Sequence, residues 1–227
     1  MFSRIRSAAM PCAVLAMMFL VWPFVRHALD LGVAGLRDGD ATGSRLYVPG
    51  ADVPNIAIFV HMASGAVLTL LVGLQLWEGI RRHRMRLHRL NGYVMFTCAM
   101  LTGAGGLAYI ALQGTIGGLW MDVGFALYGL LMIGVAVQTV RRAQQHRIVA
   151  HRRWALRLFV LAMGSWLYRV HYGLWYALTG GVASNDAFTG AFDLVQNFAF
   201  YLPYLLLLEL WFRWRPVQRE MSVQTSL

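Results

Sequence analysis

The chain contains no lysine, only two cysteines and few acidic residues: ten, against 20 basic residues that are all arginine. Cys12 and Cys98 lie in separate apolar segments, so the sequence holds neither a disulfide framework nor a Cys-x-x-Cys redox or zinc motif. We attribute the absence of lysine to genome composition. Any chemistry must therefore use histidine, arginine, carboxylate and aromatic side chains.

Charge is also scarce, because only 13% of the 227 residues are charged while 58% are hydrophobic. This is far more apolar than the composition of a soluble domain. The net charge of +10 would suggest nucleic acid as the partner of a soluble chain. Here, however, the arginines gather in short loops between apolar runs, a pattern that orients membrane helices. We predict a multi-pass membrane protein that contacts lipid headgroups and binds no nucleic acid.

Apolar segments of nearly the length that crosses a bilayer, about 20 helical residues, occur six times. They are residues 8–24, 54–79, 90–112, 119–140, 154–178 and 188–212. We expect an all-α bundle of six transmembrane helices, with residues 1–227 forming a single membrane domain. Arg4 and Arg6 precede the first segment as in a signal peptide, but no convincing cleavage site follows, so we expect an uncleaved span. The main outer loop is predicted at 25–53 and a short polar tail at 216–227.

The arginines predict the orientation of the helices. The amino terminus, the second and fourth loops and the carboxyl tail carry most of them, whereas aspartates balance the arginines of the outer loop. Cytoplasmic loops are enriched in arginine, so both termini are predicted to be cytoplasmic and the protein to lie in a bacterial inner membrane. The arginine-rich loops are expected to bind anionic headgroups. A protein partner or a homo-oligomer within the membrane is left open.

One motif occurs twice in these loops. Residues 83–89 and 146–152 both read His-Arg-x-x-x-His-Arg, and each comes directly before an apolar run. Histidines five residues apart do not share a helix face and no carboxylate is near them in these loops, so we expect no metal site. The second histidine of each copy, His88 or His151, begins a helix at the same cytoplasmic level. These two are the candidates for a site at the inner face.

Ionisable groups within the membrane are costly, so each of them is a candidate for function. Arg169 is the most informative, since it lies roughly 13 Å inside the outer end of its span and cannot lose its charge. Asp193, or else Asp122, has a compatible depth to pair with it. Such a pair would fix helix register. Alternatively, Arg169 would clamp an anionic or carbonyl group of a haem or a quinone.

Axial histidine ligation is one way to hold haem, and the depths permit two pairs. An outer haem would lie between His61 and His171, and an inner haem between His88 and His151. At 100° per residue, His171 points about 160° away from Arg169, which disfavours the outer pair.

Small residues recur at every fourth position below His61, at Gly65, Thr69 and Gly73. We interpret this stripe as a close helix contact, with room for a flat cofactor as the alternative.

These residues together resemble a family of predicted bacterial multi-pass membrane proteins that is described as a domain of unknown function. The elements that carry the resemblance are His61 followed by Gly65, Gly73 and Gln75, then Leu87-His88-Arg89 with Gly92, then His151-Arg152-Arg153-Trp154 with Arg157 and Arg169. The match runs from about Tyr47 to Arg169 and implies several helices with no established activity. Leu87-His88-Arg89 with Gly92 also resembles an element of b-type haem membrane reductases, in which the histidine is a haem ligand. The predicted span at 119–140 contains no histidine and so departs from the di-haem pattern.

We predict electron transfer through a b-type haem or a quinone held in the bundle. The candidate cofactor-binding residues are His61, His88, His151, His171, Arg169 and Asp193. Two alternatives are a non-catalytic accessory or assembly subunit, in which these groups are structural, and a small anion-binding transporter. The sequence assigns no catalytic residue and no reaction.

Overall fold

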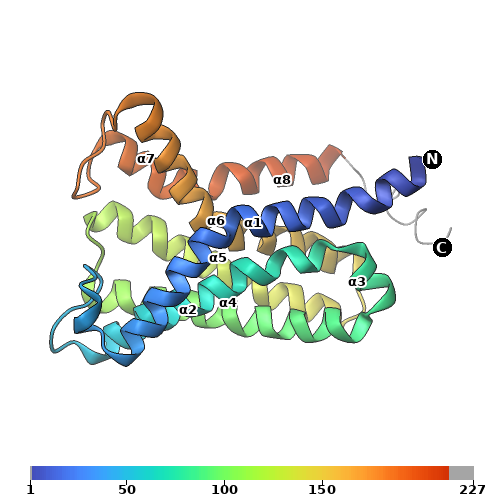
Figure 1. Cartoon of the computed structure of the whole chain (residues 1–227), viewed down its shortest axis with the longest axis horizontal. Coiled ribbons are helices and arrows are strands. Elements are labelled where there is room, and N and C mark those ends of the chain that lie inside the picture. Colours follow the sequence, from blue (N-terminus) through green and yellow to red (C-terminus); the bar gives the residue numbers. More distant parts are fainter. Residues whose placement is uncertain (1, 215–227) are drawn as a thin grey trace.

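The structure, a computed structural model, describes residues 2–214, with side chains described from Pro11 onward. Within this range the chain is helical and has no strand, which confirms the all-α prediction. The helices are α1 (Phe2–Arg37), α2 (Asp52–Leu76), α3 (Glu78–His83), α4 (Met85–Gln113), α5 (Gly118–Gln144), α6 (Ile148–Thr179), α7 (Ala191–Ala199) and α8 (Leu202–Trp214), with a 3-10 turn at Asp40–Thr42 (Figure 1). The predicted tail at 216–227 lies outside the described residues.

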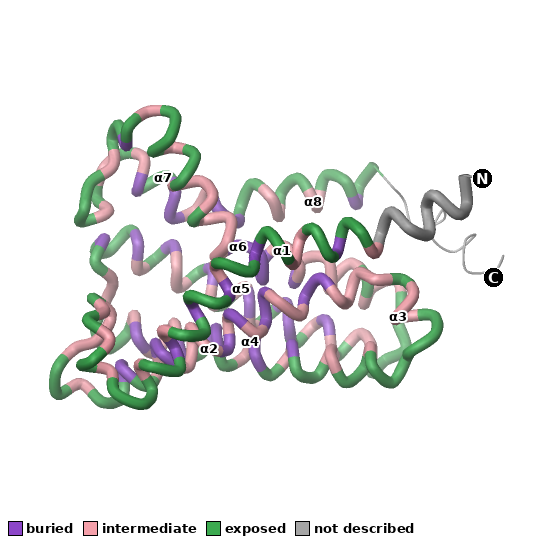
Figure 2. The backbone as a smooth tube through the Cα atoms, viewed as in Figure 1, coloured by how far each residue is buried: buried purple, intermediate pink, exposed green. Residues whose placement is uncertain are grey.

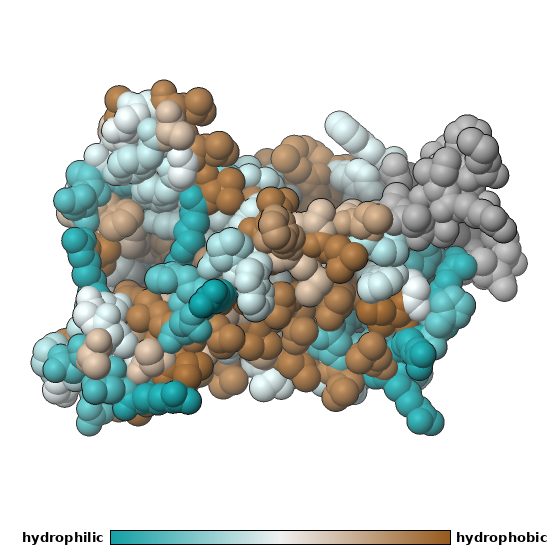
Figure 3. Space-filling view, in the orientation of Figure 1, coloured by the Kyte–Doolittle hydropathy of each residue, from teal (hydrophilic) through white to brown (hydrophobic). Residues whose placement is uncertain are grey.

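Among the described residues, five helical segments are long and apolar enough to cross a membrane. They are Pro11–Arg37, Asp52–Leu76, Met85–Gln113, Gly118–Gln144 and Ala191–Trp214. On the face shown in Figure 3, apolar side chains form a belt between hydrophilic ends. The 32 residues of α6 are sufficient in length, but Arg157, Arg169 and His171 make this helix less apolar than the other five segments. The protein is thus a multi-pass membrane protein.

The first helix is longer than the sequence predicts. A span at 8–24 followed by an outer loop at 25–53 is the sequence-based expectation, but α1 continues to Arg37. The connection to α2 is therefore confined to residues 38–51. The first predicted span was too short and the predicted loop was too long.

Packing against α2 explains the longer helix. Val25 and Ala28 are only 1% and 4% exposed. A Cβ added to Gly32 would lie 2.7 Å from the backbone nitrogen of Ala63, so the glycine allows the two helices to approach closely. Pro23 lies inside α1, as membrane helices tolerate. An apolar face with a small residue at the contact thus extends the helix beyond the proline.

The last predicted span, 188–212, is divided into α7 and α8. The break falls at Phe200 and Tyr201, directly before Pro203. Proline has no backbone N–H and fits the first turn of a helix, so α8 begins there. The rings of Phe200 and Tyr201 are fully buried and pack on aromatic rings of α5. The break therefore anchors the two short helices to the core.

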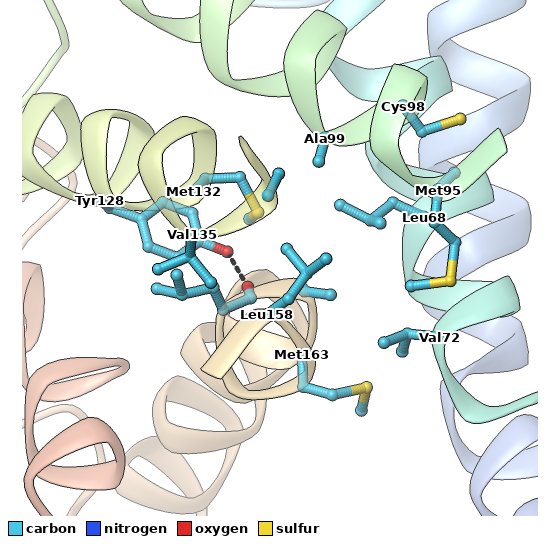
Figure 4. Close-up of a cluster of buried hydrophobic side chains, with 14 of the residues drawn as sticks. Leu68, Val72, Met95, Cys98, Ala99, Tyr128, Met132, Val135, Leu158 and Met163 are labelled. Atoms are coloured by element: carbon cyan, nitrogen blue, oxygen red, sulfur yellow. Dashed lines mark hydrogen bonds between the residues drawn. The ribbon is translucent and has the colours of Figure 1, made fainter. Parts of the chain in front are cut away.

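The core lies where α2, α4, α5 and α6 meet in the middle of the bundle, where buried positions concentrate (Figure 2). Each of the four helices contributes aliphatic or methionine side chains, among them Leu68, Val72, Met95, Ala99, Met132, Val135, Leu158 and Met163 (Figure 4). The buried Tyr128 hydroxyl donates a hydrogen bond to the backbone carbonyl of Leu161, which joins α5 to α6.

The stripe of small residues on α2 makes the close contacts that the sequence predicts. Gly65 faces α4, and Gly73 faces Met17 of α1. The Thr69 hydroxyl lies 3.1 Å from the carbonyl oxygen of Ala162 on α6, to which it donates. The packing interpretation is confirmed, and these contacts hold α2 at the centre of the bundle.

Candidate functional site

The polar residues predicted inside the membrane form separate groups. We call the end of the bundle that holds α3 and the α5–α6 turn the arginine-rich end, and the opposite end the α7 end (Figure 1). Three groups result: His61 with Arg169 in the half nearer the α7 end, His171 with Gln196 and Tyr204 of α7 and α8, and His88 with His151 at the arginine-rich end.

His61 on α2 is held in one orientation by α4. Its Nδ1 lies 2.6 Å from the carbonyl oxygen of Thr102. A carbonyl oxygen only accepts, so Nδ1 carries the proton and Nε2 is the nitrogen left for another partner. A Cβ added to Gly106 would lie 2.9 Å from this Nδ1, so the imidazole lies directly on a glycine of α4. The ring is therefore fixed while its Nε2 can serve a ligand.

Arg169 on α6 has no carboxylate partner among the described residues. Its Nη1 donates to the carbonyl oxygen of Ser165 at 3.0 Å, and its guanidinium lies 4.7 Å from the ring centroid of Phe24 on α1. His61 and Tyr128 lie close enough to interact with its charge. The side chain is exposed on one side. An arginine at this depth normally needs a counter-charge or an acceptor, so the group is chemically incomplete.

The helices spread apart at the α7 end. There, α7 and the adjoining half of α6 diverge from α1 and α2 (Figure 1). The space-filling view shows a recess between these parts (Figure 3). Aromatic side chains flank the guanidinium, so a ligand for it would combine an apolar body with an oxygen acceptor.

The predicted pairing of Arg169 with Asp193 is wrong. The Asp193 carboxylate is fully buried and accepts hydrogen bonds from the hydroxyls of Tyr172 and Ser184, both at 2.7 Å. It also accepts from the backbone N–H groups of Asn185 and Gly190, at 3.2 and 2.9 Å. Four donors compensate the buried charge, so Asp193 fastens the α6–α7 loop to the start of α7.

The alternative partner of Arg169 is also engaged elsewhere. Asp122 accepts a hydrogen bond from the backbone N–H of Thr115 at 2.7 Å, in the turn before α5. Both candidate carboxylates hold loops at the α7 end, and neither neutralises the guanidinium.

His171 faces α7 and α8, away from Arg169, as its helical angle predicts. Its Nδ1 lies within hydrogen-bond distance of the Gln196 amide, and its Nε2 lies 2.7 Å from the Tyr204 hydroxyl. Both ring nitrogens are occupied, and His61 is directed at α4 instead. His61 and His171, the predicted axial ligands of an outer haem, therefore do not face a common site.

His88 and His151 approach each other at the arginine-rich end, close enough for their charges to interact. The Nδ1 of His151 lies 3.0 Å from the carbonyl oxygen of Thr139, which leaves its Nε2 free. The Nδ1 of His88 is buried and has no hydrogen-bond partner. Arg81 on α3 is another neighbour of His88. Burial, followed by the charge of Arg152, lowers the pKa of the Arg81 guanidinium.

The inner pair supplies the two imidazoles that a haem would need. The His151 ring is oriented by the hydrogen bond of its Nδ1 to a backbone carbonyl, as is common for histidines that bind metals. The nearest charged neighbours of the pair are cations, which favour an anionic group at the same place. Haem ligation by His88 and His151 stays a prediction.

One polar contact that the sequence does not predict joins α6 to α8. Arg157 donates from Nε and Nη2 to the two carboxylate oxygens of Glu209, at 2.6 and 2.9 Å. Its guanidinium also lies 4.5 Å from the ring centroid of Trp154 and 5.1 Å from that of Phe212. The matching depth of Arg157 and Glu209 on successive predicted spans was the signal that could have revealed this pair.

An all-helical bundle with several apolar helices and polar groups at membrane depth defines the class as a multi-pass membrane protein. Residues 58–212 match the model of a family described as predicted membrane protein (DUF2306), and the chain belongs to this family. The match includes His61, His88, His151 and Arg169 but not α1. Comparisons with curated proteins and with solved structures gave no match.

Proposed function

We propose that this protein binds a lipid-soluble quinone in the half of the bundle nearer the α7 end and takes part in electron transfer in a bacterial inner membrane. The observation that carries the proposal is the guanidinium of Arg169, which has no carboxylate partner among the described residues and is exposed on one side. A quinone carbonyl oxygen accepts hydrogen bonds from such a donor without bringing a full charge into the membrane.

The neighbours of Arg169 support a quinone over a small anion. The Phe24 ring and the aromatic residues of α5 and α6 offer apolar surface to a flat ring. His61 presents a free Nε2 near the same guanidinium. Reduction of a quinone to a quinol takes two electrons and two protons, and an imidazole can pass protons near neutral pH. A redox partner protein would supply the electrons, while His61 would exchange a proton with the quinone oxygen.

The proposal includes the course of the chain through the membrane. We infer six crossings with both termini in the cytoplasm, α6 being the crossing that carries the ligand. The support is the length of α6, its position inside the bundle against α5, and the arginines in the last turn of α3 and in the α5–α6 turn. The positive-inside rule assigns those turns to the cytoplasm.

Titration with ubiquinone-1 tests the proposal. In the purified detergent-solubilised protein, the quinone should quench tryptophan fluorescence with saturation. Arg169→Gln should raise the dissociation constant by about tenfold or more, since a hydrogen bond from a charged donor is worth about 1.5–3 kcal/mol. Arg169→Lys should restore part of the affinity because it keeps the charge.

Arg26→Gln is the matched control. Arg26 is an exposed arginine of α1 that pairs with Asp30 at 3.6 Å, and the charged and polar groups that act on the Arg169 guanidinium are Tyr168 and Tyr128 instead. This variant should bind ubiquinone-1 as the wild type does. Equal affinity of the wild type and Arg169→Gln would overturn the proposal.

A further inference from the structure

Basic side chains converge at the arginine-rich end without matching acids. Arg81 on α3 lies near Arg152 on α6, and His88 on α4 lies near both Arg81 and His151. We call these four residues the basic cluster. Helices α3, α4 and α6 thus place the positive charges of Arg81 and Arg152 together, beside two imidazoles. Like charges at short range repel one another, so this arrangement is costly unless an anion joins it.

The acids nearby do not supply that anion. Glu78 also acts on the charge of Arg81, but its carboxylate forms an ion pair with Arg82 at 2.8 Å. Glu209 is held by Arg157 on the other side of α6. Among the described residues, the basic cluster is therefore left with an excess of positive charge.

Unused hydrogen-bond donors accompany this excess. The Nδ1 of His88 is buried and unpartnered, and so are the Nε atoms of Arg142 and Arg153 beside the α5–α6 turn. A buried polar group without a partner costs about 1–3 kcal/mol. Buried donors, together with unpaired cations, call for a ligand with several acceptor oxygens.

We propose that the basic cluster binds the phosphate group of an anionic phospholipid. A phosphate oxygen would accept from His88 and from the guanidinium groups of Arg81 and Arg152, as arginine and phosphate commonly pair. The cluster lies at the start of α4, a candidate span, which is the depth of headgroups. Leu87 and Leu90, exposed by 50% and 64% at the same level, offer apolar surface to acyl chains. This site is independent of the proposed quinone site.

Binding of a soluble short-chain lipid tests the proposal without a charged membrane surface. Dihexanoyl phosphatidylglycerol should raise the melting temperature of the purified protein in a neutral detergent, because a ligand of the folded state stabilises it. Dihexanoyl phosphatidylcholine should not. The variant Arg81→Gln/Arg152→Gln should bind phosphatidylglycerol about tenfold more weakly or worse, since it loses two charged donors.

Arg84→Gln/Arg141→Gln is the control, since it removes two exposed arginines of the same end that are outside the basic cluster. Its affinity for phosphatidylglycerol should remain within about twofold of the wild type, as surface charges contribute little to a local contact. If the double cluster variant does not fold, the single change Arg152→Gln, at an exposed residue, serves in its place.

Three results would overturn the assignment. One is equal loss of affinity in the cluster and control variants, which would indicate nonspecific attraction. Another is equally tight binding of inorganic phosphate, which would indicate a soluble ligand. The third is a haem Soret band that disappears in His88→Ala, which would place iron at these residues. Each result leaves the ubiquinone-1 titration at Arg169 unaffected, so the two proposals fail separately.

Discussion

At the scale of single residues, the charges of Asp193 and Arg169 have different surroundings, because Asp193 is fully buried and Arg169 is exposed. Asp193 accepts four hydrogen bonds. Arg169 donates one hydrogen bond to a backbone carbonyl and lies over one aromatic ring. A carboxylate with its full set of donors is a structural element. A guanidinium with unused donors can bind something else. We therefore propose a ligand-binding role for Arg169 and a structural role for Asp193.

The assignment of stability to Asp193 is testable by substitution. Asp193→Asn removes the charge that four donors are arranged to meet and should lower the free energy of unfolding by about 2–4 kcal/mol, as hydrogen bonds to charged groups are worth about 1.5–3 kcal/mol each. Thermal melting in detergent measures the loss. The added change Arg169→Gln should restore no stability, because Arg169 and Asp193 are not paired. Rescue in the double variant would show that they are.

Residue types and depths predicted the site only in part. The helical angle of His171 was readable from the sequence and the structure bears it out, whereas the depth of Arg169 in the membrane stays a prediction. The partner of Arg169 could not be predicted, because the depth of a residue does not give the rotation of the neighbouring helix about its own axis. Asp193 has a suitable height but is turned toward Tyr172 and the preceding loop. Tyrosine hydroxyls, which satisfy both Asp193 and His171, carry no sequence signal of their role.

At the scale of helices, glycines decide how closely α2 and α4 approach around His61. A Cβ added to Gly105 would lie 2.5 Å from the carbonyl oxygen of Ala57, so the contact is backbone to backbone. We expect Gly105→Ala to destabilise the protein by about 1–3 kcal/mol through overpacking. It should also weaken ubiquinone-1 binding, because the backbone of α4, whose Thr102 carbonyl orients His61, would shift.

Gly134→Ala is the comparison for Gly105→Ala. A Cβ added to Gly134 on α5 meets nothing within 4 Å. Alanine should there stabilise the helix by about 0.5–1 kcal/mol, because glycine loses more backbone freedom on folding. Opposite shifts of the melting temperature in the two variants are expected. A similar shift in both would contradict the close contact of α2 with α4.

The helix α8 depends on a small number of polar contacts with α6. Tyr204 in its first turn binds His171, and Glu209 near its middle binds Arg157. Glu209→Gln should weaken the first contact by about 1–3 kcal/mol, since it leaves a half-buried arginine without its charge partner. Hydrogen exchange should then accelerate in α8 and stay unchanged in α2. Unchanged exchange in α8 would show that lipid or protein contacts hold it instead.

Prediction was most reliable for the existence of these helices and least reliable for their ends. The apolar runs located α2, α4 and α5 well. The end of α1 was misjudged because Arg26 and Asp30 look like a loop, although as an i,i+4 pair on an exposed face they suit a helix. The break between α7 and α8 was marked by Pro203, but its position depends on Phe200 and Tyr201 entering the core.

At the scale of the whole molecule, the question is whether α6 crosses the membrane despite its polar residues. Single cysteines introduced as Gln144→Cys and Asp186→Cys, in a chain without Cys12 and Cys98, lie near its two ends. A membrane-impermeant maleimide should label Asp186→Cys in intact cells and Gln144→Cys only after permeabilisation. Labelling of both from one side would mean that α6 does not cross.

A crossing α6 unites the two proposed sites along one helix. The proposed phosphate site in the basic cluster lies near the start of α6, and the proposed quinone site at Arg169 lies in its other half. Lipid binding would then fix the protein in the bilayer while the quinone exchanges with the membrane at the exposed side of Arg169. If the protein is instead a structural accessory subunit, substitutions in the basic cluster and at Arg169 should change its stability, and neither site should bind a ligand.

The contact between Arg169 and a quinone oxygen is the central claim, and infrared difference spectroscopy measures it most directly. Ubiquinone-1 labelled with ¹³C at its carbonyl carbons, bound to the wild-type protein, should show a carbonyl band at lower frequency than in detergent alone, because a hydrogen bond weakens the C=O bond. In Arg169→Gln the band should return toward its free position. An unshifted band in the wild type, or the same shift in Arg169→Gln, would contradict the account.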